Sequence, residues 1–535
     1  MRAKCATFAF FVAVVACGAF AARFAAAQPP PDDALVRIDT ATFREIAVEG
    51  SSVFAADELA ALTAPYENRP ISYESLQALG QELSRRYAER GYVTSGVVIP
   101  EQSVSDASIV LRAVEGTLAT VVPEGNKRLR DGAVARRVAH YVDGPVNVAD
   151  VQRGLRNLQN DPLVERVNAE LEPGANLGES LLRVRVTERR PFELEVLAGN
   201  DRAAAIGEDH ASVGLTYRGL VGNGDALSAR FGGTDGARDN ALQYHVPVTA
   251  GGIALDFVAS EQDADIIEQP FAAIDITSRI ETFGVTASRP FVDTGERSLR
   301  ALLSFEHKRS ESTLLGMPFS FGAGEIDGKA RGSAVGLGVE WTRRATAGVI
   351  AVRGLAQGGV DVLDPTRNED EPDADFGLLV GQLDYVRRIA WRESRLLVTG
   401  TVQLTDEPLL AMYKLPVGGR HSVRGYRESQ LVRDEGFVAS IELQFPAIVD
   451  ASGQRRGKLD LAVFADYGVS RDKTEPLTGT REEHLASVGA GLLWNPLPGL
   501  HLEIYRGVEL SEQNNPHESL QDRGIHYNLA YRGRF

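Results

Sequence analysis

The chain has 535 residues and a formal net charge of −16, with 43% hydrophobic and 24% charged residues. This length allows two or three structural units, and the composition is that of a globular rather than a disordered or fibrous protein. Because nucleic-acid binding needs a basic face that neutralises phosphates, the acidic charge argues against that class of partner.

The N-terminus has the pattern of a secretory signal peptide, which we expect over residues 1–27. Arg2 and Lys4 give a positive start, residues 6–22 are apolar, and residues 25–27 are three alanines that suit cleavage. A membrane anchor is an alternative, but the run is short and alanine is a weak membrane residue. The pattern therefore favours an exported protein.

Both cysteines of the chain, Cys5 and Cys17, lie in this expected signal. A lipoprotein signal is a second alternative, because residues 14–17 loosely fit a lipidation site. With the signal peptide removed, the mature chain would have no cysteine and therefore no disulfide. Residues 28–42 are expected to form a short linker, since their three consecutive prolines disfavour a long helix.

The next part of the chain repeats one order of elements, strand–helix–helix–strand–strand. We assign the first copy to residues 43–115 and the second to residues 116–190, although one α+β domain is the alternative. In the first copy, strands are expected at 46–48, 93–99 and 107–114, with helices at 55–62 and 73–90; in the second, strands are expected at 118–123, 164–171 and 181–187, with helices at 132–141 and 149–160.

Residues 191–535 break into short segments in which apolar residues alternate with polar ones. In residues 458–468 the odd-numbered positions are apolar, and the opposite face carries Asp460 and Asp466. Residues 437–445 behave alike, with Ser440 and Glu442 on the polar face. We count about sixteen such segments, centred near residues 195, 214, 229, 244, 256, 284, 303, 337, 352, 382, 399, 441, 463, 489, 503 and 530.

The connections between these segments alternate in length. Links of a few residues lie at 221–224, 250–251, 344–345, 391–392 and 496–498, whereas longer links lie at 261–277, 309–331, 358–375, 405–435, 470–483 and 511–523. Short turns on one rim and long loops on the other are typical of outer-membrane β-barrels, and closure removes exposed sheet edges. A soluble all-β protein is the alternative, but it does not explain this alternation.

Two short motifs stand at related places in the predicted barrel. Val423, Arg424, Gly425 and Tyr426 follow a glycine-rich approach within the long link at residues 405–434. Phe464, Asp466 and Gly468 form F-x-D-x-G on the polar face of a predicted strand. Asn223, Gly224 and Asp225 fill the link between the second and third strands.

Two such modules before a sixteen-stranded barrel, together with these motifs, resemble the two-partner secretion transporters (TpsB type, ShlB/FhaC/HecB-like). They belong to the outer-membrane insertase superfamily, whose modules are called POTRA domains. The resemblance implies that the loop at about 405–434 folds into the barrel and that Arg424 pairs with Asp466. It also implies that the terminal aromatics Tyr527, Tyr531 and Phe535 act as an assembly signal; an interfacial aromatic girdle is the other interpretation.

The resemblance further implies a bacterial outer-membrane location with the modules in the periplasm. The expected partners are a secreted, TpsA-like exoprotein client, outer-membrane lipids and lipopolysaccharide, and the barrel assembly machinery. Many members carry a helix that plugs the barrel ahead of the first module, and we expect none here. An insertase for outer-membrane proteins and a passive porin are the alternative functions.

Nothing in the chain indicates an enzyme or a cofactor. It contains no nucleophile-elbow, zinc-protease, Walker or dinucleotide motif. Acidic residues crowd residues 364–375, which allows a calcium site, although a solvated surface loop is the simpler interpretation. We therefore predict no catalytic residues and no resident metal.

Overall fold

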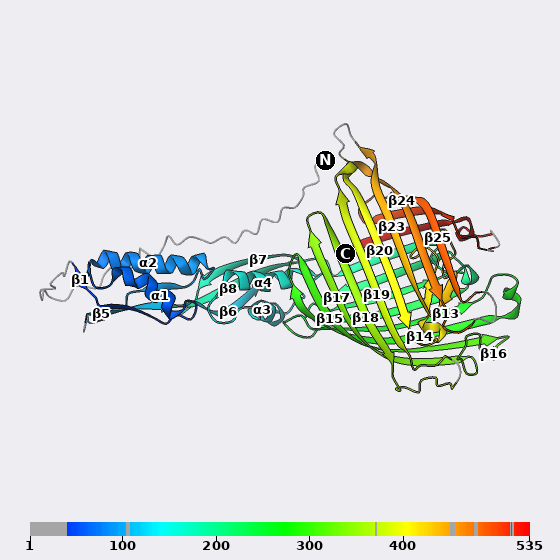
Figure 1. Cartoon of the computed structure of the whole chain (residues 1–535), viewed down its shortest axis with the longest axis horizontal. Helices are drawn as coiled ribbons and strands as arrows, with labels where there is room; N and C mark the ends of the chain where they lie inside the picture. The colour runs from blue at the N-terminus through cyan, green and yellow to red at the C-terminus, as the bar shows by residue number, and fades with distance from the viewer. Residues whose placement is uncertain are drawn as a thin grey trace. The chain divides into compact units, whose positions relative to one another are not determined.

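The computed structural model describes residues 40–102, 107–369, 372–449, 455–475, 480–513, 515 and 518–535 (Figure 1). It divides the chain into two compact units, Met1–Arg189 and Arg190–Phe535. The expected signal peptide, most of the expected linker and the segment on which the plug-helix expectation falls lie outside the described residues.

The first module contains the predicted order of elements. Its elements are β1 (Ala41–Thr42), β2 (Glu45–Glu49), α1 (Ala56–Thr63), β3 (Pro70–Ile71), α2 (Tyr73–Glu89), β4 (Gly96–Val98) and β5 (Ser108–Val114). The main sheet has the order β2-β5-β4, with β2 parallel and β4 antiparallel to β5. Helix α2 begins where the Ser72 hydroxyl accepts a hydrogen bond from the Ser75 amide, and it buries Leu79 and Leu83.

Strand β4 is shorter than the expected 93–99. The Ser95 amide donates to the Tyr92 carbonyl, which closes a turn directly after α2. The Ser95 hydroxyl then accepts a hydrogen bond from the Gly116 amide. Because these backbone groups are used in the turn, strand pairing starts only at Gly96.

The second module repeats the order with β6 (Thr117–Glu124), α3 (Asp131–Ala139), α4 (Val148–Gln159), β7 (Val164–Pro173) and β8 (Glu179–Glu188). Its sheet has the order β6-β8-β7. Helices α3 and α4 touch closely at Gly154, where a Cβ would lie 2.7 Å from the Val138 carbonyl oxygen. The Asn147 side chain caps α4 and also donates to the Arg90 carbonyl of the first module.

The C-terminal unit is a closed antiparallel barrel of sixteen long strands. They are β9 (Phe192–Gly199), β10 (His210–Arg218), β11 (Ala226–Gly233), β12 (Ala237–Pro247), β13 (Ala254–Asp265), β14 (Ile276–Asp293), β15 (Arg297–Leu314), β17 (Lys329–Ala345), β18 (Gly348–Gly359), β19 (Gly377–Ile389), β20 (Ser394–Thr405), β23 (Glu435–Val449), β24 (Arg455–Arg471), β25 (Glu482–Trp494), β26 (Leu500–Glu509) and β27 (Ile525–Arg534). Closure comes from the pairing of β27 with β9, and Figure 1 shows neighbouring strands such as β19, β20, β23 and β24 side by side. Every predicted strand centre falls within one of these strands.

The predicted alternation places apolar side chains outside and polar ones inside. On β17, Leu337 and Val339 are 66% and 51% exposed, as lipid-facing residues of an isolated barrel are. On β24, Val463 and Tyr467 are exposed while the intervening Asp466 is 4% exposed. The buried carboxylates therefore lie on the lumen side of the wall.

Among the described residues, no helix is both long and apolar enough to cross a membrane.

Links on the two rims differ in length, with one exception. Short links join β12 to β13, β14 to β15, β17 to β18, β19 to β20 and β25 to β26. The opposite rim carries the long links, except that residues 234–236 join β11 to β12 in a tight turn. The longest link, residues 406–434, is the one that holds the V-R-G-Y motif.

Candidate functional site: the loop inside the barrel

The link between β20 and β23 folds into a two-stranded arm. Its strands β21 (Leu415–Val417) and β22 (Leu431–Arg433) pair antiparallel, and the motif residues lie between them. Gly418 and Gly419 follow β21 with φ of +113° and +96°. A Cβ on Gly419 would lie 2.1 Å from the Glu428 carboxyl carbon, so this glycine-rich approach is needed to fold the arm.

The Arg424 guanidinium binds the Asp466 carboxylate in bidentate fashion. Arg424 Nε and Nη2 each lie 2.8 Å from an oxygen of Asp466, and the Arg424 amide donates to the same carboxylate at 3.0 Å. The Arg424 side chain is 8% exposed and that of Asp466 is 0% exposed. The structure thus contains the ion pair that the resemblance implied, joining the loop to the lumen face of β24.

Further residues complete the surroundings of Arg424. Its Nη1 donates to the Glu442 carboxylate, and its Nη2 donates to the Ser440 hydroxyl at 2.9 Å. The guanidinium carbon lies 3.7 Å from the ring centre of Phe464 and 4.8 Å from that of Tyr505. One cation therefore faces two carboxylates and two aromatic rings, an arrangement that suits the planar, always charged arginine and not lysine.

Sequence reasoning did not identify Glu442 or Tyr505 as partners of the motif. It placed Ser440 and Glu442 on the polar face of a strand, and the register of β23 against β24 sets Ser440 opposite Asp466. Their place on a polar face was the only indication in the sequence that these residues face the loop. The pairing register was needed to show which of them contact Arg424. Tyr505, whose hydroxyl donates to Glu442 at 3.1 Å, comes from β26, two strands away from β24.

Gly425 packs backbone against backbone. Its φ is +102°, and a Cβ there would lie 3.2 Å from the Gly507 Cα on β26. A Cβ on Gly507 would in turn lie 2.6 Å from the Gly425 Cα. The Gly425 amide donates to Nε2 of the fully buried His526 at 3.1 Å, so this ring nitrogen is the acceptor. Close approach and left-handed backbone both require glycine here.

Tyr426 ends the motif as a fully buried side chain. Its hydroxyl donates to the Ala486 carbonyl at 2.7 Å and accepts a hydrogen bond from the Ser511 amide at 3.1 Å. Val423 is also fully buried, and it would meet a Cβ on Gly468 at 2.8 Å. Gly468 of the F-x-D-x-G motif therefore leaves the space that Val423 fills.

The C-terminal aromatics lie along the seam where the barrel closes. Phe535 is 58% exposed, and its amide donates to the Phe192 carbonyl of β9 at 2.8 Å. Tyr531 pairs with Val196 across the same seam. The Tyr527 hydroxyl donates to Asp209 at 2.8 Å. These positions fit a girdle, and an assembly signal remains a prediction.

The acidic segment is partly folded into the barrel mouth. Asp364 pairs with Arg331 at 2.6 Å, and Asp375 lies 3.5 Å from Arg367. Ala374 is fully buried in a cluster that includes residues of the inward loop. Within the described ranges, no group of three histidine, cysteine or acidic residues is placed to hold a metal; residues 370–371 fall outside them.

Asp225 of the Asn223-Gly224-Asp225 stretch organises a turn. Its carboxylate accepts hydrogen bonds from the amides of Val221, Gly222 and Asn223 at 3.0–3.3 Å. Gly222 and Gly224 have positive φ. The stretch therefore shapes the link between β10 and β11.

Comparison with known proteins gives two family matches. Residues 178–493 match the haemolysin secretion/activation protein family ShlB/FhaC/HecB, and residues 41–116 match the ShlB-type POTRA domain. The chain is 23% identical over 419 residues to the outer membrane transporter CdiB of Dickeya dadantii, covering 76% of this chain and 72% of that protein. It is 21% identical over 450 residues to the heme/hemopexin transporter protein HuxB of Haemophilus influenzae, covering 82% and 77%.

Solved structures show the same fold. CdiB from Escherichia coli superimposes with a TM-score of 0.68 at 18% identity, covering 94% of this chain and 93% of that one. BamA from Haemophilus ducreyi lacking POTRA domains 1–3 gives a TM-score of 0.56 at 14% identity, covering 92% and 100%. The family match spans more than half of the chain and includes both motifs of the site. The chain therefore belongs to the ShlB/FhaC/HecB family of haemolysin secretion/activation proteins, which are two-partner secretion transporters of the bacterial outer membrane with POTRA domains in the periplasm.

Proposed function

We propose that the chain captures an unfolded, TpsA-like exoprotein in the periplasm and passes it through the barrel to the cell surface. The observation that carries this proposal is the inward loop, which is tied to the lumen wall by a buried arginine whose three side-chain nitrogens all donate hydrogen bonds. A passive porin has no use for such an anchor or for a periplasmic arm. A transporter needs a seal at rest and a part that can move when a client enters.

Capture begins at the first module in this proposal. Strand β4 is an edge of the sheet, so an extended client segment can add to it through backbone hydrogen bonds that tolerate many sequences. Val98 on this strand is 45% exposed and Tyr73 is 60% exposed. A neighbouring cavity of about 370 Å³ offers an apolar lining of Phe43, Ile71, Leu76, Ile99 and Ile109 for client side chains. The second module acts as a second POTRA domain.

The Arg424 cluster holds the loop while no client is present. Two carboxylates and one guanidinium in a closed site give a strong attachment only as a set, because removal of one partner leaves a buried charge uncompensated. Loop displacement then opens a path for an extended chain. No nucleotide-binding loop is present in the sequence, so we propose that folding of the client outside the cell gives the direction.

The remaining partners follow from the location of the barrel. Outer-membrane lipids and lipopolysaccharide would contact the exposed apolar band on strands such as β17. The barrel assembly machinery would recognise the C-terminal strand that ends in Phe535. Deletion of Phe535 is expected to lower the amount of protein in the membrane, as measured by immunoblot of outer-membrane fractions; unchanged amounts would leave Phe535 a girdle residue only.

The test is secretion of the protein encoded beside this chain, which is the candidate client. Cells co-express both proteins, and the culture medium and cell surface are assayed for the client. Export is expected to require this chain and to fall strongly in Arg424→Ala. Arg331→Ala is the matched control, because it also removes an arginine from an ion pair, but its partner Asp364 is exposed and lies in the link between β18 and β19 rather than on the wall beside Arg424.

Two outcomes would redirect the proposal. If the client stays in the periplasm although the barrel assembles correctly, an insertase function or a client encoded elsewhere becomes the better explanation. Normal export by Asp466→Arg would show that the Arg424–Asp466 pair has no part in transport. Assembly is checked in each variant by heat-modifiable migration on gels.

A further inference from the structure

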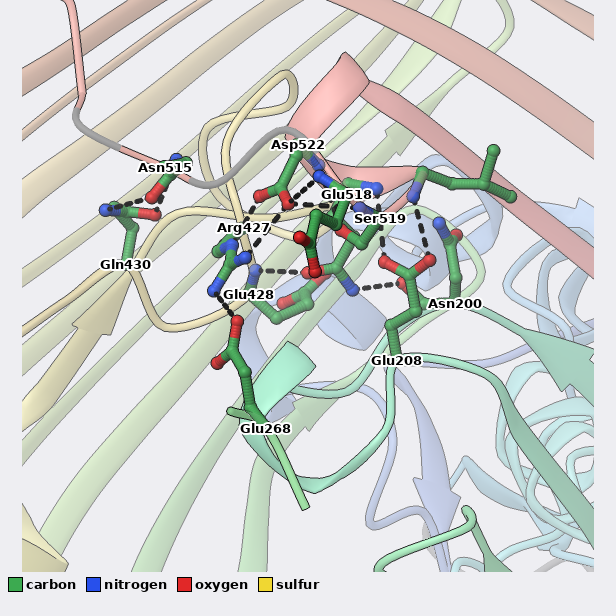
Figure 2. Close-up of polar contacts among 12 residues, drawn as sticks. Asn200, Glu208, Glu268, Arg427, Glu428, Gln430, Asn515, Glu518, Ser519 and Asp522 are labelled. Atoms are coloured by element: carbon green, nitrogen blue, oxygen red, sulfur yellow. Dashed lines mark hydrogen bonds and ion pairs between the residues drawn. The ribbon is translucent and has the colours of Figure 1, made fainter. Parts of the chain in front are cut away.

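A second arginine of the loop, Arg427, binds a different part of the barrel. Its Nη2 donates to Asp522 at 2.9 Å, its Nε donates to the other oxygen of that carboxylate, and its Nη1 donates to Glu268 at 2.8 Å. Figure 2 shows Arg427 between these two carboxylates, which project from separate segments. Asp522 lies in the link between β26 and β27, and Glu268 lies in the link between β13 and β14.

The Asp522 carboxylate is also held in place by groups other than Arg427. It accepts hydrogen bonds from the amides of Glu518 and Ser519, both at 3.1 Å, and its side chain is 0% exposed. Although burial acts to raise it, hydrogen bonds from Arg427 and from these amides hold the pKa of Asp522 below its usual range. The carboxylate is therefore charged at neutral pH and oriented toward the loop.

The link that carries Asp522 is fixed on its far side as well. The Gln521 side chain accepts a hydrogen bond from the Glu428 amide at 3.0 Å and donates to the Asn200 carbonyl at 2.8 Å. Glu208 accepts hydrogen bonds from the amides of Leu520 and Gln521 (Figure 2). The link after β26, which carries Asp522, is therefore hydrogen-bonded to the link after β9, and together they form a fixed binding surface for Arg427.

The two arginines contact different walls. Arg424 binds side chains of the strands β23 and β24, whereas Arg427 binds side chains of two links on the opposite rim from the short turns. That rim is extracellular, because β9 enters the barrel from the periplasmic modules and runs toward it. Breaking the Arg424 cluster alone would leave the tip of the loop attached to the extracellular links.

We propose that Arg427 is a second positioning residue of the inward loop, which closes the extracellular mouth by joining the loop to Asp522 and Glu268. This inference rests on the proposed function in that the loop must move for a client to pass. Arg427 touches no client in this account; it acts through the loop. The inner anchor at Arg424 and the outer anchor at Arg427 hold the loop independently.

The experiment measures the closed state without any client. The full-length protein is reconstituted in planar lipid bilayers, and the single-channel open probability is recorded for wild type, Arg427→Glu, Asp522→Asn and Arg331→Ala. Arg427→Glu is expected to raise the open probability several-fold, and Asp522→Asn is expected to raise it less because the side-chain shape is kept. Arg331→Ala is expected to match wild type.

A charge exchange separates an anchor from a general structural defect. The double variant Arg427→Glu with Glu268→Arg restores opposite charges across the more exposed contact and keeps the amide hydrogen bonds of Asp522, so its open probability is expected to fall below that of Arg427→Glu alone. A merely damaged loop would not recover. Heat-modifiable migration confirms that each barrel has assembled before it is recorded.

The outcomes keep this inference separate from the proposed function. A raised open probability that the exchange reverses supports the outer anchor, whether or not any client is secreted. An open probability of assembled Arg427→Glu equal to wild type would overturn it. In that case, secretion by Arg424→Ala would still decide the proposed function.

Discussion

The periplasmic modules and the barrel use strand alternation in opposite senses. In the modules, apolar residues such as Leu83 and Val134 are buried, and the charged residues lie mostly outside, apart from the buried ion pair of Arg137 and Asp161. In the barrel, Leu337 is 66% exposed and Asp466 is 4% exposed. Burial of apolar surface from water therefore stabilises the modules. The barrel depends on its closed backbone ladder and on polar clusters that fix the loop.

The largest effect is expected from a substitution in the polar cluster on the lumen face of the barrel. Arg424→Ala leaves Asp466 and Glu442 buried without their cation, which costs about 3–5 kcal/mol at a buried pair. The part of the loop around Arg424 is expected to leave the wall while the Arg427 contacts still hold the tip and the barrel stays assembled, because the strand ladder does not involve Arg424. Limited proteolysis of the loop in reconstituted protein measures this, with Arg424→Lys as the conservative variant. Equal protection in Arg424→Ala and wild type would contradict it.

A core truncation tests the module side. Leu83→Ala in α2 removes a side chain that is 2% exposed and is expected to cost about 2–5 kcal/mol of unfolding free energy. All α-helices that the structure describes lie in the modules, so the helical circular dichroism of the full-length protein reports their urea unfolding. Leu337→Ala on the lipid-facing wall is the matched control and should leave this transition unchanged. A shift of the urea transition by the same amount in Leu83→Ala and Leu337→Ala would contradict this difference between the modules and the barrel.

The motif glycine gives a smaller effect. Gly425→Ala places a Cβ at φ of +102° and 3.2 Å from the Gly507 backbone. The left-handed backbone alone costs about 1–2 kcal/mol for an L-residue. The loop is expected to loosen less than in Arg424→Ala, as judged by the same proteolysis. Gly354→Ala, where a Cβ meets nothing within 4 Å, is the control that should behave as wild type.

The smallest effect is a pH dependence of the first module. Partial burial acts to raise the pKa of Glu115, but hydrogen bonds from Ser52, Val53 and Tyr87 lower it below its ordinary value of 4.5. A lowered folded pKa means that the stabilisation is present above about pH 4.5 and is lost as pH falls through the folded value. Because Glu115 is only partly buried and solvent screens its interactions, less than about 1 kcal/mol is expected.

The measurement is the urea midpoint of the helical signal at neutral pH and at pH values below 4.5. Wild type is expected to lose more stability on acidification than Glu115→Gln, which has no carboxylate to titrate. The same pH dependence in both proteins would assign the effect to other groups.

Much of the architecture could be predicted from local pattern. Period-two alternation located all the long strands, because each wall strand must present one face to lipid and one to the lumen. The order of elements in both modules followed from helical spacing and capping residues such as Ser72. The bounds of strand β4 were predicted less well, because the Ser95 amide forms a turn hydrogen bond with the Tyr92 carbonyl and is not free for strand pairing.

The sequence by itself thus determined the strand positions, the two repeated modules, the V-R-G-Y loop and the face on which Asp466 lies. The tertiary structure decided which of many polar side chains meet the loop. Glu442, Tyr505 and His526 approach Arg424 and Gly425, and Asp522 approaches Arg427, from strands and links up to 101 residues away. Every lumen-facing strand carries polar residues, so local alternation cannot select among them. The register and closure of the barrel make that selection, because they fix the height at which each strand passes the loop.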